Sequence, residues 1–254
     1  QEQITAQETV AWIREHRHEQ PEKPWFALAS FSRPHFPLTA PKRWTDKYPV
    51  DQVTAPKAPA SGDTFDHPVN QTMREGFRVE GLSYEDQQKM RAGYFACVSY
   101  FDEIIGDLLN RLELSGDLEN TIIIYASDHG EMAGEHGSWW KHTYHEASTR
   151  VPMIISLPEH RSGSKAATQV ETPVSLIDLY PTLCSFAGAD FSEAEGRDLS
   201  QSLTQSEEPE LIPIFSDNLK PRWGEGSEYR MVRYGDFKYV GFRGGSEFLF
   251  NLVN

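Results

Sequence analysis

The sequence is short of cysteine, of long apolar runs and of basic residues, and each shortage excludes a class of protein. Cys97 and Cys184 are its only cysteines, too few for a disulfide scaffold and without the CxxC spacing of zinc or redox sites. No apolar run reaches the roughly 20 residues of a membrane-spanning helix. The 24 basic and 38 acidic residues give a net charge of -14, which argues against a nucleic-acid-binding surface. We therefore expect a globular protein with no nucleic-acid partner and no membrane span.

The most informative stretch covers residues 121–158, TIIIYASDHGEMAGEHGSWWKHTYHEASTRVPMIISLP. An apolar run of strand length lies at each end, which predicts two buried strands around a polar loop. The loop has a histidine content that a purely structural turn does not need; its histidines are His129, His136, His142 and His145. Ligands of open α/β sheets bind just beyond the carboxyl ends of strands. Asp128 and His129 directly follow the first run, so we expect them at a binding site.

Two helices and one strand are predicted before this stretch. Residues 5–19 repeat apolar side chains at helical spacing, which predicts an amphipathic helix. WFALASF at residues 25–31 has the composition of a buried strand, and a proline-rich loop that contains His35 follows it. A helix of about seven turns or more is predicted from Ser83 to Gly116. This helix leads into the apolar run before Asp128 and forms the αβ half of a βαβ unit.

The chain changes character towards its C-terminal end. A helix closed by Gly188 is predicted despite Pro181. Beyond about residue 190, short apolar runs alternate with Gly, Asp and Pro, which is typical of antiparallel strands. We therefore predict an α/β domain at residues 1–189 and a small C-terminal subdomain at residues 190–254. Residues 48–81 show little periodicity and are expected to form a surface excursion that shapes a substrate pocket.

Asp128 and His129 together offer a carboxylate oxygen and an imidazole nitrogen. Neighbours on a regular strand point to opposite faces, so both reach one ion only where the strand has broken into a loop. Gly130 makes that break easy. The donor pair suits a divalent cation such as calcium, manganese or zinc, although two ligands do not fix the metal. An isolated Asp-His pair is more often structural, but the histidine-rich loop around this one favours a metal.

Lys141 lies thirteen residues after Asp128, between Trp140 and His142. An ammonium group is a compact cation that can neutralise a tetrahedral oxyanion beside a metal, and aromatic neighbours lower the local dielectric and can pack on a substrate. Taken alone, a lysine is more often an ordinary exposed residue. Its place in a loop of ligand-type residues favours anion binding.

Five ordered segments resemble type I sulfatases of the alkaline-phosphatase-like superfamily, especially the branch that contains iduronate 2-sulfatase and choline sulfatase. SDHGEMAGEHGSWWKHTYHEASTRVPMII is similar to the second signature of that family. The other segments are WFALASFSRPHFPLTAPKRW, GYFACVSYFDEIIGDLLNRLELSGDLENTIIIYASDHG, VSLIDLYPTLCSFAG and GSEFLFNL. The resemblance implies an alkaline-phosphatase-like α/β fold, with a mixed sheet flanked by helices and a small C-terminal antiparallel sheet. Residues 1–189 would be the carboxyl half of its catalytic domain.

The resemblance also implies roles for the residues that match the family pattern. Asp128 and His129 would be ligands of one divalent metal, calcium by preference, with manganese and zinc as alternatives; many arylsulfatases carry Asn in place of this histidine. Lys141 would bind the sulfate oxygens. His35 would contact sulfate or protonate the leaving oxygen as a general acid.

Further residues of the loop would act around that centre. His142 and Trp140 would contact the substrate. Glu146 and Arg150 would hold the loop against the following strand.

One large part of the family's site has no counterpart in this sequence. The nucleophile of type I sulfatases is a formylglycine, made from Cys or Ser in a CxPSR or SxPSR motif, beside a DD metal pair and a further Lys and His. Neither the motif nor an adjacent DD pair occurs here, and Cys97 lies inside a helical pattern. We therefore expect this chain to be the carboxyl-terminal portion of a sulfatase, with the formylglycine supplied by an N-terminal part.

The resulting hypothesis is metal-dependent hydrolysis of a sulfate ester, preferably of a sulfated carbohydrate. The expected partners are a sulfated small molecule or glycan and the N-terminal part of the same sulfatase. One alternative is a phosphonate or phosphate ester hydrolase of the same superfamily, and another is a non-catalytic carbohydrate-binding remnant. By analogy with the family, we expect a location in the periplasm, the lysosome or the extracellular space.

Overall fold

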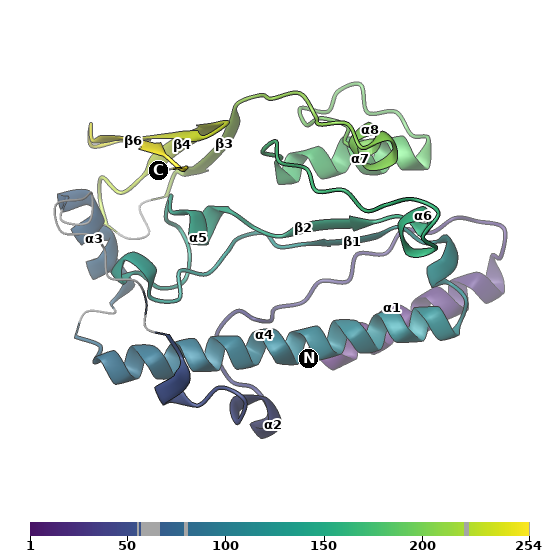
Figure 1. Ribbon diagram of the computed structural model, residues 1–254, viewed down its shortest axis with the longest axis horizontal. Coiled ribbons are helices and arrows are strands. Elements are labelled where there is room, and N and C mark those ends of the chain that lie inside the picture. Colours follow the sequence, from purple (N-terminus) through teal and green to yellow (C-terminus); the bar gives the residue numbers. More distant parts are fainter. Residues whose placement is uncertain (55, 57–66, 79–80, 221–223, 254) are drawn as a thin grey trace. The chain divides into compact units, whose positions relative to one another are not determined.

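The computed structural model describes residues 1–54, 56, 67–78, 81–220 and 224–253 (Figure 1). Contacts divide the chain into two units: Gln1–Lys57 with Gly81–Ile122, and Ala58–Glu80 with Ile123–Asn254. The predicted boundary between residues 189 and 190 lies within the second unit. It rests on a change in sequence character and stays a prediction.

The first unit is built on two helices that pack against each other, α1 (Glu2–Glu19) and α4 (Tyr84–Leu114). Both were predicted. α4 begins at the expected cap, where the Ser83 hydroxyl oxygen accepts a hydrogen bond from the Asp86 N–H at 3.1 Å. With 31 residues at 1.5 Å each, α4 is about 46 Å long. Short helical segments complete the unit: α2 (Lys42–Thr45), η1 (Val50–Gln52) and η3 (Leu118–Asn120).

The buried face of α4 includes Ala96 and Cys97, and Cys97 is fully buried. The adjacent Val98 is 40% exposed. Small side chains at Ala96 and Cys97 allow close packing at this place. Burial raises the pKa of the Cys97 thiol, in keeping with a core cysteine rather than a reactive one.

Residues 25–31 are extended, but the prediction of a buried strand is wrong. Phe26 is 68% exposed and Leu28 is 82% exposed. No strand of the described part of the chain pairs with this segment. Its aromatic residues favour an extended backbone, whereas a buried strand also needs a neighbour that binds its N–H and C=O groups. The described residues supply no such neighbour.

The second unit starts with the two strands expected around the polar loop. β1 (Ile123–Ala126) and β2 (Met153–Ser156) pair antiparallel, with Ile123 opposite Ser156 and Ala126 opposite Met153. The strands are less buried than predicted, since Ile154 is 60% exposed. Their connection contains two short helical turns, η4 (Glu135–Gly137) and α5 (Glu146–Thr149).

Helical segments follow β2: α6 (Pro158–Arg161), η5 (Leu176–Asp178), α7 (Leu179–Ala187) and α8 (Ser200–Gln205). α7 confirms the predicted helix. Pro181 lies in its first turn, where the missing N–H has no intrahelical partner to lose. Gly188 closes the helix with a φ of 66°, a left-handed conformation that favours glycine.

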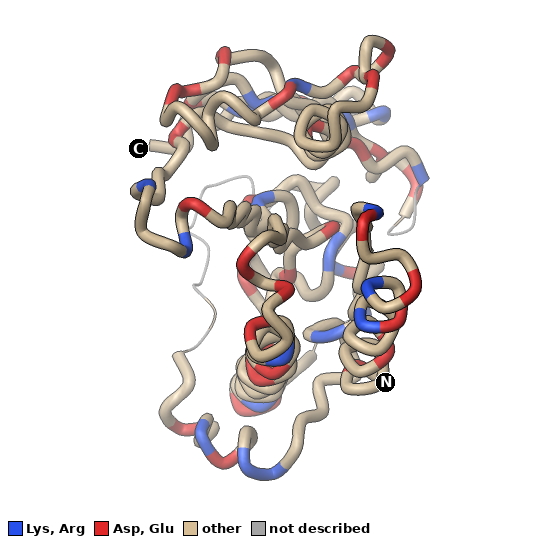
Figure 2. The backbone as a smooth tube through the Cα atoms, turned by 90° about the vertical axis from the view of Figure 1, so that its right-hand side faces the viewer, with Lys and Arg blue, Asp and Glu red and all other residues tan. Residues whose placement is uncertain are grey.

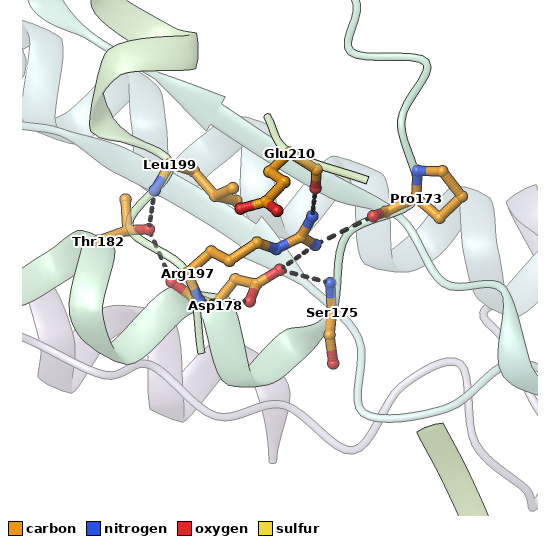
Figure 3. Close-up of polar contacts among 7 residues, drawn as sticks. All are labelled: Pro173, Ser175, Asp178, Thr182, Arg197, Leu199 and Glu210. Atoms are coloured by element: carbon orange, nitrogen blue, oxygen red, sulfur yellow. Dashed lines mark hydrogen bonds and ion pairs between the residues drawn. The ribbon is translucent and has the colours of Figure 1, made fainter. Parts of the chain in front are cut away.

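Buried Asp178 connects these segments (Figure 3). Its carboxylate accepts hydrogen bonds from the Ser175 N–H at 2.9 Å, the Arg197 N–H at 2.7 Å and the Arg197 Nη2 at 2.8 Å. The Arg197 guanidinium also donates to the carbonyl oxygens of Pro173 and Glu210. One paired carboxylate therefore fixes the path of residues 173–210.

The C-terminal antiparallel sheet was predicted and is present. Its strands are β3 (Ile214–Asn218), β4 (Tyr229–Tyr234), β5 (Phe237–Phe242) and β6 (Glu247–Asn251), in the spatial order β3-β4-β5-β6. One face of the sheet forms an apolar core with Tyr144 and with two residues of α3 (Pro68–Phe77), Val69 and Met73. α3 is a regular part of the excursion predicted at residues 48–81, of which residues 55, 57–66 and 79–80 lie outside the described residues.

Two further properties concern the membrane span and the nucleic-acid-binding surface that the sequence argues against: the character of the helices and the distribution of charge. None of the described helices combines the length and apolar character that a membrane crossing needs. Figure 2 shows acidic residues along helices and loops of both units, interspersed with basic ones. The negative net charge is therefore distributed over the chain.

Candidate functional site

Asp128 and His129 lie immediately after the end of β1, where the backbone has left the strand. Asp128 Oδ2 and His129 Nε2 are 3.6 Å apart. The other ring nitrogen, Nδ1, lies 2.9 Å from the Gly130 carbonyl oxygen. Because a carbonyl oxygen only accepts, this contact places the hydrogen of a neutral His129 ring on Nδ1 and the lone pair on Nε2. Two electron-pair donors thus face each other, an arrangement that a cation would stabilise.

This pair fits part of a metal site. Its carboxylate oxygen and imidazole nitrogen are donors that calcium, manganese and zinc accept to different degrees. The Asp128 side chain is 86% exposed, so an ion could reach it from solvent. Within the described ranges, no group of three or more His, Cys, Asp and Glu side chains is placed to hold a metal. Asp128 and His129 would therefore contribute only some of the ligands.

Gly130 fixes the course of the loop after this pair. Its N–H donates to the Ser148 carbonyl oxygen at 2.8 Å. A Cβ atom added at Gly130 would lie 2.0 Å from the Ala147 carbonyl oxygen, far inside van der Waals contact. The chain therefore crosses α5 at a distance that only glycine permits.

Glu131 organises the next ten residues, and sequence reasoning did not identify it. Its Oε1 accepts hydrogen bonds from the Ala133 N–H at 3.0 Å and the Trp140 N–H at 2.7 Å. The Met132 N–H adds a bond to the Trp140 carbonyl oxygen at 2.8 Å. Residues 132–140 thereby close into a compact turn. No periodic pattern marks such a residue, because it acts through backbone groups that every sequence carries.

Lys141 is half-buried at the end of this turn, in the same loop as the predicted metal ligands. Its neighbours Trp140 and His142 have φ values of 68° and 70°. Such left-handed conformations are costly for residues other than glycine and persist only where the surroundings enforce them. Asp128, His129 and the segment 140–142 thus lie in the same connection between β1 and β2. Their predicted roles with metal and substrate stay predictions.

His35 lies in the first unit, on the loop after residues 25–31. Its Nδ1 is 3.0 Å from the Phe36 carbonyl oxygen, and the centroids of the His35 and Phe36 rings are 4.0 Å apart with the planes inclined by 34°. Arg33 holds this loop by donating to the Pro37 carbonyl oxygen at 2.9 Å and to Cys97 Sγ, on α4, at 3.1 Å. The proposed place of His35 beside sulfate stays a prediction.

Two further histidines of the loop form a stacked pair. The rings of His136 and His145 have centroids 4.0 Å apart and planes inclined by 6°. A small pocket beside them is lined by polar side chains of α3 and the loop, including Asn70, Arg74 and Ser138. Burial lowers the pKa of His145 well below its ordinary value, and the positive charges of His136, Lys238 and Arg74 add to the effect.

Comparison with known proteins gives this loop a family context. Residues 1–189 match a protein-family model described as Sulfatase. A sulfatase of Formosa agariphila is 28% identical over 250 residues, which cover 94% of this chain and 46% of that protein. A choline-sulfatase of Rhizobium meliloti is 33% identical over 173 residues, which cover 67% of this chain and 33% of the relative. An iduronate 2-sulfatase of Mus musculus is 32% identical over 198 residues, which cover 65% of this chain and 36% of that protein. The chain thus spans less than half the length of these relatives.

Solved structures share the fold. A phosphonate monoester hydrolase of Agrobacterium radiobacter superposes with a TM-score of 0.77 at 26% identity, covering 98% of this chain and 53% of the other. A 2-O GAG sulfatase superposes with a TM-score of 0.77 at 22% identity, and the superposition covers 98% of this chain and 55% of the other. At this lower identity, the second likeness concerns the fold alone.

Proposed function

Because the chain belongs to the sulfatase family, we propose that it serves the metal-dependent hydrolysis of a sulfate ester, preferably of a sulfated carbohydrate. One observation carries the proposal: Asp128 Oδ2 and His129 Nε2 face each other at 3.6 Å in the same loop as Lys141. A cation site and an ammonium group in one loop suit an anionic ester. Family membership and the sulfatase relatives support the choice of sulfate.

Four side chains of this chain have roles in the proposed reaction besides those of the metal ligands. Lys141 binds the sulfate oxygens and helps to stabilise the negative charge that develops on the leaving-group oxygen as the S–O bond breaks. His35 donates a proton to the leaving oxygen, so that the alcohol departs uncharged. His142 and Trp140 contact the organic part of the ester and orient it.

Asp128 and His129 would hold the cation, for which calcium is our first choice. A bound divalent ion supplies positive charge beside the ester oxygens. The hydrogen bond from His129 Nδ1 to the Gly130 carbonyl oxygen keeps Nε2 available as a ligand. We assign the nucleophile, a formylglycine, to an N-terminal part of the sulfatase.

A phosphonate monoester hydrolase is the second candidate. The superposition on the Agrobacterium radiobacter enzyme at 26% identity favours it. A phosphonate monoester and a sulfate monoester both carry a single negative charge, so one lysine and one metal would serve either. The carbohydrate preference rests on the sequence relationship to an iduronate 2-sulfatase, whose name gives a sugar acid as its substrate.

The deciding experiment compares two esters of the same alcohol. The full-length protein, purified with any fragment that accompanies it, is given 4-nitrophenyl sulfate and 4-nitrophenyl phenylphosphonate, each with calcium and with EDTA. We expect faster, EDTA-sensitive hydrolysis of the sulfate ester. Faster hydrolysis of the phosphonate would favour the second candidate. Binding of sulfated glycans without any turnover would favour a non-catalytic remnant.

Location is part of the same proposal. Family relationship suggests the periplasm, the lysosome or the extracellular space. Cell fractionation of the native protein would test this suggestion.

A further inference from the structure

Lys238 is a charged residue on the inward face of the C-terminal sheet. Side chains alternate along β5, so Lys238 points the same way as Val240 and Phe242. All three are buried, and Lys238 retains only 3% of its side-chain exposure. A lysine is almost never so deeply buried unless it is paired. Its hydrogen-bond and ion-pair partners therefore show which part of the structure it stabilises.

Both partners of Lys238 belong to the loop that carries Lys141. Its Nζ donates to the Tyr144 carbonyl oxygen at 2.8 Å and to Glu146 Oε1 at 2.9 Å. Burial lowers the pKa of Lys238, and the negative charge of Glu146 opposes this shift. The ammonium group thus binds one backbone atom and one side chain of the loop, just beyond Lys141.

The Tyr144 side chain is held equally firmly. It is fully buried, and its hydroxyl donates to Asn70 Oδ1 at 3.0 Å. Aromatic rings of the C-terminal sheet surround it, with centroids 5.6 to 6.0 Å away; they belong to Tyr229, Phe242, Phe248 and Phe250. The backbone at Tyr144 is therefore a fixed point from which the preceding residues extend.

The segment between these anchors contains Lys141. On its N-terminal side, the Glu131 carboxylate fixes the Trp140 N–H. On its C-terminal side, Lys238 fixes the Tyr144 carbonyl. The left-handed residues Trp140 and His142 lie between the two anchors. A backbone in this costly conformation relaxes when an anchor is lost.

We propose that Lys238 is a positioning residue, which holds the Tyr144 backbone and thereby keeps Lys141 in place for the substrate anion. The proposal rests on the proposed function of Lys141. It assigns the C-terminal sheet a part in the reaction, through the position of Lys141.

A double-mutant cycle tests this role in the full-length protein. Lys238→Met, Lys141→Ala and the double variant are compared with the wild type for kcat and KM with the ester that the wild type hydrolyses. A misplacement of about 1 Å at a reacting group can cost roughly 100-fold in rate. We expect Lys238→Met to lower kcat at least about tenfold in the wild-type background, and less than about twofold once Lys141 is alanine. Equal fold losses of kcat in both backgrounds would overturn the proposal, because the rate effects of two residues that act independently multiply.

Arg233→Met is the matched control. Arg233 Nη1 also pairs with the Glu146 carboxylate, at 3.0 Å, but the described contacts of Arg233 include none with Tyr144. We expect it to lower kcat less than about threefold, since the Lys238 bond to Tyr144 remains. A loss as large as that of Lys238→Met would show that Glu146 pairing alone matters. If Lys238→Met does not fold, Lys238→Gln, whose amide still donates to one oxygen, enters the same cycle.

The dissociation constant for inorganic sulfate, measured by calorimetry, gives the cycle a readout that needs no turnover. If the wild type hydrolyses no sulfate ester, the proposed function fails, while the positioning role is still decided by these constants. Weaker binding in Lys238→Met that disappears in the Lys141→Ala background is expected. Unchanged sulfate affinity and unchanged kcat in Lys238→Met would refute the positioning role alone.

Discussion

The imidazole rings of His136 and His145 stack in parallel, with centroids 4.0 Å apart. Burial and nearby positive charges lower the pKa of His145 in the folded protein. In the unfolded chain this histidine takes up a proton near its ordinary pKa of 6.5. The unfolded state therefore binds more protons in the window between these two values. Stability from His145 is fully present above 6.5 and is lost as the pH falls towards the folded value.

We accordingly predict that His145→Gln flattens the pH dependence of stability. Urea midpoints measured at about pH 7.5 and about pH 5 should differ less in this variant than in the wild type. His18→Gln, at an exposed position of α1, is the control and should retain the wild-type difference. If the urea midpoints of His145→Gln differ between the two pH values as much as those of the wild type, other groups cause the acid sensitivity.

Removing the buried carboxylate of Asp178 should destabilise the second unit. Asp178→Ala leaves Arg197 without its partner in a buried site, and breaking a buried pair in this way costs about 3–5 kcal/mol. Urea unfolding measures the change. Asp46→Ala breaks the exposed pair with Lys42, whose side chains are 58% and 85% exposed, and should cost less than about 1 kcal/mol. Similar costs for both variants would argue against a structural role of the Asp178 cluster.

Gly130→Ala should disturb the loop after β1. The added methyl carbon would meet the Ala147 carbonyl oxygen at 2.0 Å, so the backbone beside Asp128 and His129 must move. We expect a loss of about 2–3 kcal/mol in stability and a large loss of turnover. Gly106→Ala in α4 is the matched change, because its Cβ meets nothing within 4 Å. It should stabilise the helix by about 0.5–1 kcal/mol.

Asp128→Ala in the full-length protein should abolish turnover and weaken binding of the divalent ion. The reason is the loss of the carboxylate that faces His129 Nε2 at 3.6 Å. Metal content after dialysis and the rate of ester hydrolysis check both effects. Asp107→Ala, at an exposed position of α4, should change neither. Turnover that survives in Asp128→Ala would remove this residue from the site.

Lys141→Ala should lower kcat/KM by about 10² to 10³, which is typical for the loss of a preorganised oxyanion contact. Steady-state kinetics on the full-length protein measure the effect. Lys220→Ala, an exposed lysine of the same unit, should remain within about twofold of the wild type. A near-normal rate in Lys141→Ala would make it an ordinary surface residue.

Sequence patterns predicted features that depend on neighbours along the chain. The Ser83 cap, the long periodicity of α4 and the short C-terminal apolar runs separated by Gly, Asp and Pro are local features, and the structure shows the expected helix and antiparallel strands. Asp128, His129 and Lys141 could be singled out because all three lie in the connection between β1 and β2, and their roles stay predictions. The exposure of residues 25–31 could not be predicted, because burial depends on what packs there. The carboxylate of Glu131 escaped attention because it binds backbone groups.

Lys238 was overlooked although the sequence carries a signal for it. In FKYVGF, the lysine occupies the same alternating position as Val240 and Phe242. A charge in the inward series of a strand indicates a buried pair. Its partner Glu146 was expected to hold the loop against β2. Instead, its carboxylate pairs with Lys238 and Arg233 of the C-terminal sheet, and Arg150 is exposed.

The bond between Lys238 and Tyr144 spans 94 residues of sequence. At a synthesis rate of about 5–20 residues per second, Tyr144 leaves the peptidyl-transferase centre roughly 5 to 19 seconds before Lys238 does. Throughout that interval the nascent loop has its histidines and its lysine but not the ammonium group that fixes its backbone. Its final geometry can form only after β5 has been translated, so the loop matures seconds after its own residues have been synthesised.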